Sequence, residues 1–449
     1  MIQIGCNRGS HGVLLMTDQP FRVPYSKSNI YFSVPSGISV DVATSKELPP
    51  VQDVRAAVKA ALDAPIGSPP LTDPIKPTDQ VCIVFTDITR STPEEILVPA
   101  LLTELEAAGV KDDNITLLCG IGMHRSSTPE EKDAILGPEI VRRYRVIDNE
   151  PQNPEALVDL GVTPGGVPVQ AHKAAVDADF LISTGIIEPH QYAGYSGGRK
   201  TVAVGAAGEP LIAYTHSPDF IDHPGTRLGK IAGNPFHEAI TEAAHRAGLD
   251  FIINVVLDDN KNLLRVGAGD PDQAFMELVA FAKTVYEVPI NKQYDLAIGG
   301  VGYPKDSNLY QASRSPSYMF FAPTPVVKPE GYYIIPARCE EGAGEGIGEQ
   351  RFLAAMRDAP NIQAVLDDAR QHGYPPGQQR AFVLAKVLEH NPVIIVGSEC
   401  PETVKACKMI PAETMDAAFE IVTAKLGEDL DALLVPHSLQ TLPVLEVEA

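Results

Sequence analysis

The feature that most constrains the fold is an alternation of strand-like and helix-like segments that begins near residue 80. The first strand candidate is a continuous apolar run, VCIVFTD, at residues 81–87, which ends in polar residues as buried parallel strands do beside a site. Helix-like segments follow at residues 93–109, 128–136, 236–248 and 270–288, and strand-like segments at 115–122, 144–148, 178–185 and 251–258. This alternation predicts an α/β fold in which helices cover both faces of a mainly parallel sheet.

A second series of strand candidates follows at residues 294–300, 331–337, 392–398 and 431–437, with helical segments between them. A chain of 449 residues is too long for one ordinary core. We therefore predict two α/β domains, residues 1–290 and residues 291–449. Before Lys46, the short apolar bursts VLLM, YFSV and ISVDVA predict a small set of strands.

Charge and cysteine content exclude some classes of partner and compartment. The net charge of −22 argues against binding to nucleic acid or to an anionic membrane surface. No apolar run approaches the length of a membrane span, and the first 16 residues lack the pattern of a signal peptide. The six cysteines form no CxxC pair and no regular framework, which favours a cytoplasmic protein.

Polar and basic residues gather where the predicted strands end. Open α/β sheets place their sites beyond the carboxyl ends of the strands, so we expect these stretches to converge. They read TDITRSTP (86–93), GIGMHRSSTPEE (120–131), STGIIEPHQYAGYSGGRKT (183–201) and GGVGYPKDSNLYQASR (299–314).

Three of the eleven histidines, His124, His190 and His216, lie at or near these strand ends beside Gly, Ser or Thr. A lone histidine is more often a solvated or hydrogen-bonded bystander than a catalytic group. We give that reading to the other eight: His11, His172, His223, His237, His245, His372, His390 and His437.

The run EPHQYAGYSGGRKTVAVG, residues 188–205, suits neither a helix nor a strand because each interior glycine is costly. It fails the P-loop pattern, since Arg199 stands where that pattern needs glycine, and HEAITEAAH downstream is not HExxH. Its glycines would let backbone N–H groups approach an anion or a flat ring, and Lys200 could act as a point charge or an amine nucleophile. The alternative is a surface turn with a solvated lysine.

With these motifs assembled, the chain resembles the nickel-dependent lactate racemase family, whose members carry a nickel-pincer nucleotide. The resemblance covers the chain from about Thr86 to Arg314 and rests on an ordered set of motifs. These are DITRSTP, GMHRSSTPEE, EPHQYAGYSGGRK, THS, GNPFHEAI and YPKDSNLYQASR.

The resemblance implies a role for each matching residue. His124 and His190 would be paired acid/base groups, and His216 would be the protein ligand of nickel. The cofactor, a pyridinium-3-thioamide-5-thiocarboxylic acid mononucleotide carrying nickel, could be covalently attached at Lys200. The resemblance further implies cofactor contacts from Asp87, Gly197, Gly198 and Tyr310, and substrate contacts from Arg90, Gln311 and Arg314.

The chemistry implied is inversion at C2 of a 2-hydroxy acid, with hydride leaving to the cofactor and returning to the other face of a 2-keto acid. Two imidazoles suit a hydroxyl proton that leaves and returns on either side, and an arginine can hold the carboxylate. The resemblance places the active site in the cleft between the two domains. It implies a small-molecule substrate and transient contact with cofactor-making enzymes, and it allows a homo-oligomer.

Two departures from lactate racemases bear on the substrate. Arg314 stands where those enzymes have lysine, and the chain contains no Trp for the indole wall of their pocket. We therefore predict a larger or more polar acid than lactate, such as a hydroxy-dicarboxylate or a sugar acid. The alternatives are a cofactor-binding protein without catalysis and a metal-assisted hydrolase that shares only the architecture.

Overall fold

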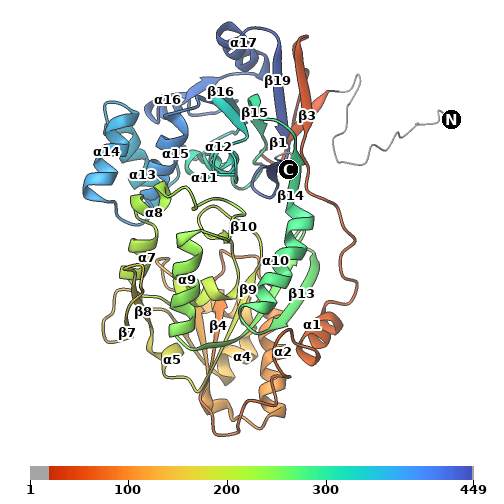
Figure 1. Cartoon of the computed structure of the whole chain (residues 1–449), viewed down its shortest axis with the longest axis vertical. Coiled ribbons are helices and arrows are strands. Elements are labelled where there is room, and N and C mark those ends of the chain that lie inside the picture. Colours follow the sequence, from red (N-terminus) through yellow and green to blue (C-terminus); the bar gives the residue numbers. More distant parts are fainter. Residues whose placement is uncertain (1–19, 447–449) are drawn as a thin grey trace, which may run out of the picture. The chain divides into compact units, whose positions relative to one another are not determined.

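Residues 20–446 of a computed structural model describe the fold, and they divide into two compact units (Figure 1). The first unit comprises residues 47–285. The second unit joins the segment that precedes Glu47 to the segment that begins at Tyr286. The predicted VLLM strand and the N-terminal stretch without a signal-peptide pattern lie outside the described residues.

The sheet of the first unit has the strand order β13-β12-β9-β4-β5-β6. Neighbouring strands are parallel except β12 and β13, which are antiparallel. The strands are β4 (Val81–Thr86), β5 (Ile115–Gly120), β6 (Arg145–Asp148), β9 (Phe180–Ile186), β12 (Leu249–Leu257) and β13 (Leu263–Gly269). Two small antiparallel pairs accompany the sheet: β7 (Leu157–Val162) with β8 (Pro168–His172), and β10 (Pro189–His190) with β11 (Gly194–Tyr195).

Helices of the first unit bury their apolar faces against this sheet. In α2 (Glu94–Ala107), Leu97, Leu101 and Leu105 recur at the helical period and are buried in the core with Ile83 and Phe85 of β4. The other helices are α1 (Val54–Asp63), α3 (Pro129–Leu136), α4 (Pro138–Arg143), α5 (Lys173–Val176), α6 (Gly198–Lys200), α7 (Glu209–Thr215), α8 (Pro218–Asp222), α9 (Pro235–Arg246) and α10 (Gln273–Tyr286). A 3₁₀ turn lies at Asp112–Asn114 and a π-helical turn at Thr201–Gly205.

The second unit contains a six-stranded parallel sheet of order β18-β17-β16-β15-β19-β3. Its strands are β3 (Ile38–Val42), β15 (Tyr294–Gly299), β16 (Val327–Pro336), β17 (Val393–Val396), β18 (Ile410–Ala412) and β19 (Leu430–Val435). Its helices are α11 (Leu309–Ala312), α12 (Arg314–Phe320), α13 (Ile347–Asp358), α14 (Ile362–His372), α15 (Gln379–Leu388), α16 (Pro401–Ala406) and α17 (Met415–Leu426). The short strands β14 (Glu287–Ile290) and β20 (Leu442–Leu445) pair in parallel. The predicted α/β class is confirmed.

The two units differ from the predicted domains in the place of the N-terminal segment. β3 hydrogen-bonds to β19 in the second unit, so the predicted grouping of residues 20–46 with the segment up to residue 290 does not match the contacts. The hairpin of β1 (Phe21–Tyr25) and β2 (Ser28–Phe32) places Val23 and Phe32 in the core of the same unit. Apolar side chains of both hairpin strands are thereby buried among residues from the other end of the sequence.

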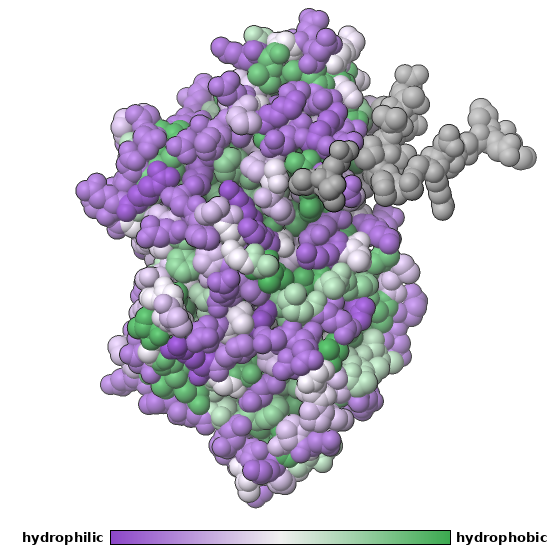
Figure 2. All heavy atoms as spheres, in the orientation of Figure 1, coloured by the Kyte–Doolittle hydropathy of each residue, from purple (hydrophilic) through white to green (hydrophobic). Residues whose placement is uncertain are grey.

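The face drawn in Figure 2 is mainly hydrophilic, with hydrophobic residues in scattered patches. None of the helices between residues 20 and 446 combines the length and the hydropathy that spanning a bilayer requires.

Candidate active site

The first three predicted strand-end stretches meet at one edge of the first unit's sheet. β4 pairs with both β5 and β9 in parallel, so the residues that follow these strands leave the sheet on the same side. Asp87 follows β4, His124 follows β5, and His190 follows β9 in the short strand β10. The fourth stretch, with Tyr310 and Gln311, belongs to the second unit.

Asp87 and His124 form a hydrogen-bonded pair that the sequence did not predict. The distance between His124 Nδ1 and Asp87 Oδ2 is 2.6 Å. The Asp87 carboxylate is 5% exposed, whereas the His124 side chain is 49% exposed. A carboxylate only accepts hydrogen bonds, so His124 Nδ1 carries a proton and the lone pair of the neutral ring lies on Nε2. His124 is therefore placed as a general base that the buried Asp87 carboxylate orients.

Asp87 is held in its ionised form. Burial by itself would raise the pKa of this carboxyl, but hydrogen bonds from His124 and Thr89 and the charges of His124 and Arg90 together lower it. Thr89 donates both its backbone N–H and its hydroxyl to Oδ1, at 3.1 and 2.6 Å. Arg90 itself is exposed and follows Thr89 directly.

His190 is held in the opposite way, by the backbone of its own turn. Its Nδ1 accepts hydrogen bonds from the N–H groups of Tyr192 and Ala193, at 3.3 and 3.1 Å. The turn closes between β10 and β11, where Gly194 has φ +76°. A Cβ atom at residue 194 would collide with the carbonyl oxygen of Lys230, so glycine is required by both the angle and the space.

An aromatic cluster joins His190 to His216. Their rings both lie against Phe236, with centroid distances of 6.3 and 5.0 Å, and both lie against Tyr192, at 5.8 and 5.5 Å. Phe236 is fully buried in the first turn of α9, whose N-cap is Asn234. The structure thus brings His190 and His216, two of the three predicted histidines, into contact with the same two aromatic rings.

His216 has the protonation state that a metal ligand needs. Burial lowers the pKa of His216 to about 4; the nearby Lys200 charge contributes to this lowering, and the hydrogen bond with Ile212 opposes it. Nδ1 lies 2.8 Å from the carbonyl oxygen of Ile212 and donates to it, so the lone pair of the neutral ring lies on Nε2. Between residues 20 and 446, no three His, Cys, Asp or Glu side chains cluster as a metal site. The lone pair on His216 Nε2 can supply one ligand to a metal ion.

The glycines before Lys200 face protein atoms. A Cβ at Gly197 would lie 2.7 Å from Ile187 Cδ1, and one at Gly198 would lie 2.9 Å from Ile252 Cγ2. The Gly198 N–H donates to Asn254 Oδ1 at 2.9 Å. Close packing of α6 on β9 and β12 is thus a sufficient reason for both glycines, and the predicted contact of Gly197 and Gly198 with a cofactor stays a prediction.

A hydrogen-bonded network around Arg199, the residue before Lys200, was not predicted; it includes His237, which was predicted to be a solvated or hydrogen-bonded bystander. Arg199 is 4% exposed and donates to Asp272 Oδ1 at 2.6 Å and to His237 Nε2 at 3.2 Å. His237 Nδ1 in turn donates to the carbonyl oxygen of Ala193 at 3.1 Å. Burial lowers the pKa of His237 to about 4, so it is a neutral link between Arg199 and the His190 turn. The sequence did carry a signal for His237, because this residue lies in GNPFHEAI, one of the motifs that carry the family resemblance.

In the second unit, Tyr310 and Gln311 lie in α11 and Arg314 begins α12. The Tyr310 ring packs edge-on against Phe352 at 5.6 Å. Gln311 Oε1 is buried, and among the described residues it has no hydrogen-bond partner. An amide oxygen in this state can accept a hydrogen bond from a hydroxyl group of a ligand.

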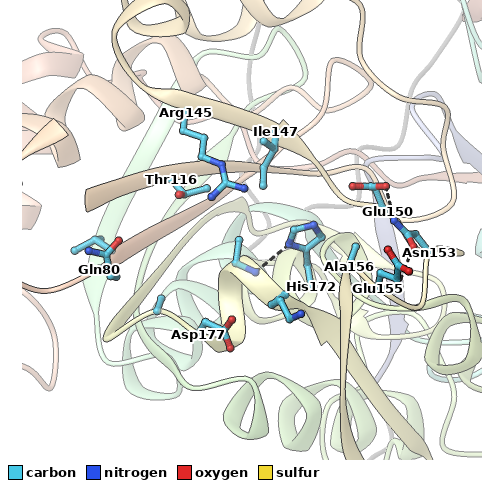
Figure 3. A pocket seen from close by; sticks show the side chains of 14 residues that line it. Gln80, Thr116, Arg145, Ile147, Glu150, Asn153, Glu155, Ala156, His172 and Asp177 are labelled. Atoms are coloured by element: carbon cyan, nitrogen blue, oxygen red, sulfur yellow. Dashed lines mark hydrogen bonds between the residues drawn. The ribbon is translucent and has the colours of Figure 1, made fainter. Parts of the chain in front are cut away.

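A cavity of about 470 Å³ lies in the first unit, at the edge of its sheet opposite to the strand-end residues (Figure 3). Gln80, Thr116 and Arg145, which lie at the amino-terminal ends of β4, β5 and β6, contribute to its lining. None of the predicted site residues lines it. The strand-end residues are therefore the better candidate site, because they combine the paired and oriented titratable groups.

Comparison with known proteins gives family matches in both parts of the chain. The model described as lactate racemase N-terminal domain matches residues 25–229, and that described as lactate racemase C-terminal domain matches residues 291–442. A lactate racemase of Thermoanaerobacterium thermosaccharolyticum is 30% identical over 425 residues, covering 94% of this chain and 98% of the relative. A lactate racemase of Lactiplantibacillus plantarum is 34% identical over 390 residues, covering 86% and 90%.

Two solved structures are also similar to this chain. The lactate racemase apoprotein from Thermoanaerobacterium thermosaccharolyticum superposes with a TM-score of 0.84 at 30% identity, covering 95% of this chain and all of that one. A Thermotoga maritima protein, at 18% identity and a TM-score of 0.64, covers 88% of this chain and 98% of its own. The second likeness is one of fold alone.

Proposed function

Since the chain belongs to the lactate racemase family and is therefore an isomerase, we propose that it inverts the C2 configuration of a 2-hydroxy acid. The observation that carries this proposal is the His124–Asp87 pair, 2.6 Å apart, at the sheet edge that also holds His190. A hydroxyl proton must be taken up and returned during inversion at C2. An imidazole oriented by a buried carboxylate suits that task near neutral pH.

His124 Nε2 would take the hydroxyl proton of the substrate. The imidazolium so formed would be stabilised by the Asp87 carboxylate, which is already ionised. Arg90 would hold the substrate carboxylate, because its exposed guanidinium follows the same strand and can bind a carboxylate through two N–H groups. Proton transfer and substrate positioning are thus assigned to Asp87 and Arg90, which follow β4, and to His124, which follows the neighbouring strand β5.

We propose that the cofactor is the nickel-pincer nucleotide. When bound, it supplies the acceptor for the hydride that leaves C2. His216 would bind the nickel through Nε2. The Lys200 amine, whose charge lowers the pKa of His216, would hold the organic part of the cofactor. The cofactor contact predicted for Tyr310 stays a prediction. The Asp87 carboxylate, which was also predicted to contact the cofactor, is hydrogen-bonded to His124 and Thr89.

We propose a substrate larger or more polar than lactate. Arg314 presents a wide planar cation where lactate racemases have lysine, and Gln311 Oε1 is a buried acceptor suited to a further hydroxyl group. Both features favour an acid with a second anionic or hydroxyl group. A hydroxy-dicarboxylate and a sugar acid meet that condition.

The test is inversion of a panel of 2-hydroxy acids by protein produced together with the enzymes that make the cofactor. We expect inversion of at least one larger acid at a higher kcat/KM than lactate, with nickel bound and Lys200 increased in mass. A clear preference for lactate would overturn the substrate proposal. Bound cofactor without inversion of any acid would indicate a binding protein, and neither cofactor nor inversion would leave the hydrolase alternative.

A further inference from the structure

Two cysteines lie side by side where β16 and β17 of the second unit's sheet end. The two strands are parallel, and hydrogen bonding between their chains continues beyond the last strand residues. The Glu399 N–H donates to the Arg338 carbonyl at 2.7 Å, and the two side chains form an ion pair of 2.8 Å. Cys339 and Cys400 are the next residues of the two chains. Paired strands lie about 4.8 Å apart, and a disulfide needs Cα atoms about 4.4 to 6.8 Å apart, so the separation of the chains here suits a disulfide.

The two sulfur atoms are in contact but are not bonded. Both cysteines are free, and a hydrogen bond joins the Cys339 thiol to the sulfur of Cys400. Ser398 Oγ lies 3.4 Å from Cys400 Sγ and accepts from the Cys400 N–H at 3.1 Å. Cys339 is fully buried, whereas Cys400 is partly exposed. The pair therefore has one sulfur that a reagent in solution can reach and one that it cannot.

The accessible sulfur is also the one that carries negative charge. The hydrogen bond from Cys339 lowers the pKa of Cys400 to about 6, whereas the same bond, together with burial, raises the pKa of Cys339. Near neutral pH, Cys400 is thus a thiolate, the nucleophilic form, in contact with a neutral thiol. A thiolate attacks a disulfide to form a mixed disulfide, which a neighbouring thiol can then resolve. Accessibility and charge therefore give Cys400 the attacking role and Cys339 the resolving role.

Cys339 also belongs to a turn that supports α11. Its N–H donates to the Asp306 carbonyl at 2.8 Å, and its carbonyl accepts from the Gly342 N–H at 3.0 Å. The Gly342 carbonyl accepts from the N–H of Leu309, the first residue of α11, at 2.8 Å. Cys339 has φ +51°, a conformation that residues other than glycine adopt uncommonly. A bond that draws the Cys339 sulfur toward Cys400 therefore strains the hydrogen bonds that hold the start of α11.

We propose that Cys339 and Cys400 form a modification site at which a small disulfide, oxidised glutathione, converts the two thiols into an intramolecular disulfide that loosens the start of α11. The inference goes beyond the proposed function and stands whether or not the protein inverts a 2-hydroxy acid.

Two exchange steps make this bond. In the first, the Cys400 thiolate attacks one sulfur of oxidised glutathione, so that a mixed disulfide forms and one glutathione thiolate leaves. In the second, the Cys339 thiol gives its proton to the released thiolate, and its sulfur attacks Cys400 Sγ and displaces the second glutathione. Two protein thiols are oxidised, and one glutathione disulfide is reduced to two thiols. An excess of reduced glutathione reverses both steps.

The first test follows the thiols themselves. The full-length protein is incubated near neutral pH with mixtures of reduced and oxidised glutathione, alkylated with N-ethylmaleimide in denaturant, and analysed by intact mass and peptide mapping. We expect the loss of two hydrogen masses and a cross-linked peptide pair that contains Cys339 and Cys400. Three buried cysteines should be alkylated as in untreated protein: Cys82, Cys119 and Cys407. Glutathione that remains on Cys400 while Cys339 is alkylated, or no change at either cysteine in oxidised glutathione alone, would overturn the proposal.

Two variants separate the attacking cysteine from the resolving one. Cys339→Ala keeps the accessible sulfur without its partner, so it should stop at the mixed disulfide and gain the mass of one glutathione. Cys400→Ala keeps only the buried thiol, so Cys339 should not react. Cys407→Ala is the matched control, because Cys407 follows α16, the helix that Cys400 precedes, and should leave the disulfide unaffected. Reaction of Cys339 in Cys400→Ala, with folding shown intact by circular dichroism, would contradict the assigned roles.

The second test measures the effect on α11. Amide hydrogen exchange of Cys339 and Leu309 is compared in reduced protein, in oxidised protein, and in protein that is oxidised and then reduced again. We expect exchange at both amides to become several-fold faster on oxidation and to recover on reduction, since both N–H groups donate to the strained connection. Cys400→Ala treated with the same reagent should show no change. A disulfide that forms without faster exchange at Leu309 would overturn the proposed effect on α11.

Discussion

At the scale of single residues, Glu94 shows how a buried side chain links the strand ends that carry the candidate site. Its Oε1 accepts hydrogen bonds from the N–H and hydroxyl of Thr86 and from the hydroxyl of Thr184, at 2.8, 2.7 and 2.7 Å. Thr86 precedes Asp87, and the Thr184 carbonyl accepts from Thr201, which follows Lys200. Glu94 Oε2 is buried, and within residues 20–446 it has no hydrogen-bond partner.

Glu94 should make the stability of the first unit depend on pH. Burial raises the pKa of Glu94 from 4.5 to about 7, against the hydrogen bonds from Thr86 and Thr184, which lower it. The folded state therefore binds this proton more tightly than the unfolded state. Its contribution is full below the unfolded pKa and is lost as the pH rises through 7, by at most about 3 kcal/mol.

The comparison of native protein with Glu94→Gln isolates this effect. From pH 5 to pH 8 in urea unfolding, we expect the native protein to lose stability relative to the variant, which keeps an uncharged acceptor at all pH values. Glu95→Gln is the matched control, because Glu95 is the next residue of α2 and is exposed. A difference between native and Glu94→Gln that stays constant with pH would contradict the prediction.

Cys400 should be the most readily alkylated of the described cysteines near neutral pH. A hydrogen bond from the Cys339 thiol lowers the pKa of Cys400 to about 6, and one from Ser398 contributes, whereas burial raises the pKa of Cys82 and Cys407 to about 12. The rate of iodoacetamide labelling at Cys400, followed by peptide mass spectrometry, should fall as the pH drops below 6. Cys339→Ala should move that midpoint upward; an unchanged midpoint would show that Cys339 is not the cause.

The sequence could indicate candidate site residues but not their hydrogen-bond partners. His124, His190 and His216 stood out because each lies near a strand end rich in small polar residues. The contact of His124 with Asp87 joins residues from two loops, and no periodicity reports on a hydrogen bond across loops. Glu94 reads as an exposed acid in the first turn of a helix, where an acid is favoured by the helix dipole. Its burial depends on the two threonines that reach it from β4 and β9.

At the scale of elements, the long periodic segments were predictable and several of the short ones were not. The predicted strand at 81–87 and helix at 93–109 are β4 and α2 within two residues at each end. β7 and β8 were missed because their sequences, LVDLGV and PVQAH, carry little apolar alternation. The run that holds the turn between β10 and β11 was recognised as unusual, and the cofactor contact predicted for its Gly197 and Gly198 stays a prediction, since packing on protein is a sufficient reason for both glycines.

Gly194→Ala tests the turn that holds His190. The residue has φ +76°, and a new Cβ would collide with the Lys230 carbonyl oxygen. The angle alone costs an L-residue about 1–2 kcal/mol, and the collision should add to this and displace the His190 turn. We expect both a lower midpoint of thermal unfolding and a loss of inversion activity.

Gly137→Ala is the matched control for that variant. Gly137 has φ +86°, and a Cβ at this position meets nothing within 4 Å. It should show the cost of the angle without the collision and without an effect on activity. Equal loss of stability in the two variants would mean that the Lys230 carbonyl moves aside easily and that the turn is less rigid than the structure indicates.

At the scale of the whole molecule, the grouping of chain segments into units could not be read from the sequence. Local pattern predicted strands before Lys46, and β2 and β3 are there. A strand does not encode which sheet it joins, and the pairing of Ile38–Val42 with Leu430–Val435 links the two ends of the chain. The predicted boundary near residue 290 lies close to the division at Tyr286, because a helix ends there and a new strand series begins.

This arrangement predicts different behaviour for two fragments. Residues 47–285 contain every strand of the first unit's sheet, so this fragment should fold alone, with cooperative unfolding and native-like circular dichroism. Residues 286–449 lack β3 and the β1–β2 hairpin. That fragment exposes the hydrogen-bonding edge of β19 and the apolar surface that Val23 and Phe32 cover, so it should aggregate or remain partly unfolded.

Adding a peptide of residues 20–46 to the second fragment should restore its folding, because the peptide supplies the missing edge strand and the two buried side chains. Gel filtration and circular dichroism at increasing peptide concentration would measure the recovery. A peptide with Val23→Asp and Phe32→Asp is the control, since it keeps the β3 strand and loses the apolar contacts. Folding of residues 286–449 without any peptide would show that the parallel sheet is stable with β19 at its edge and that the N-terminal segment is an accessory to this unit.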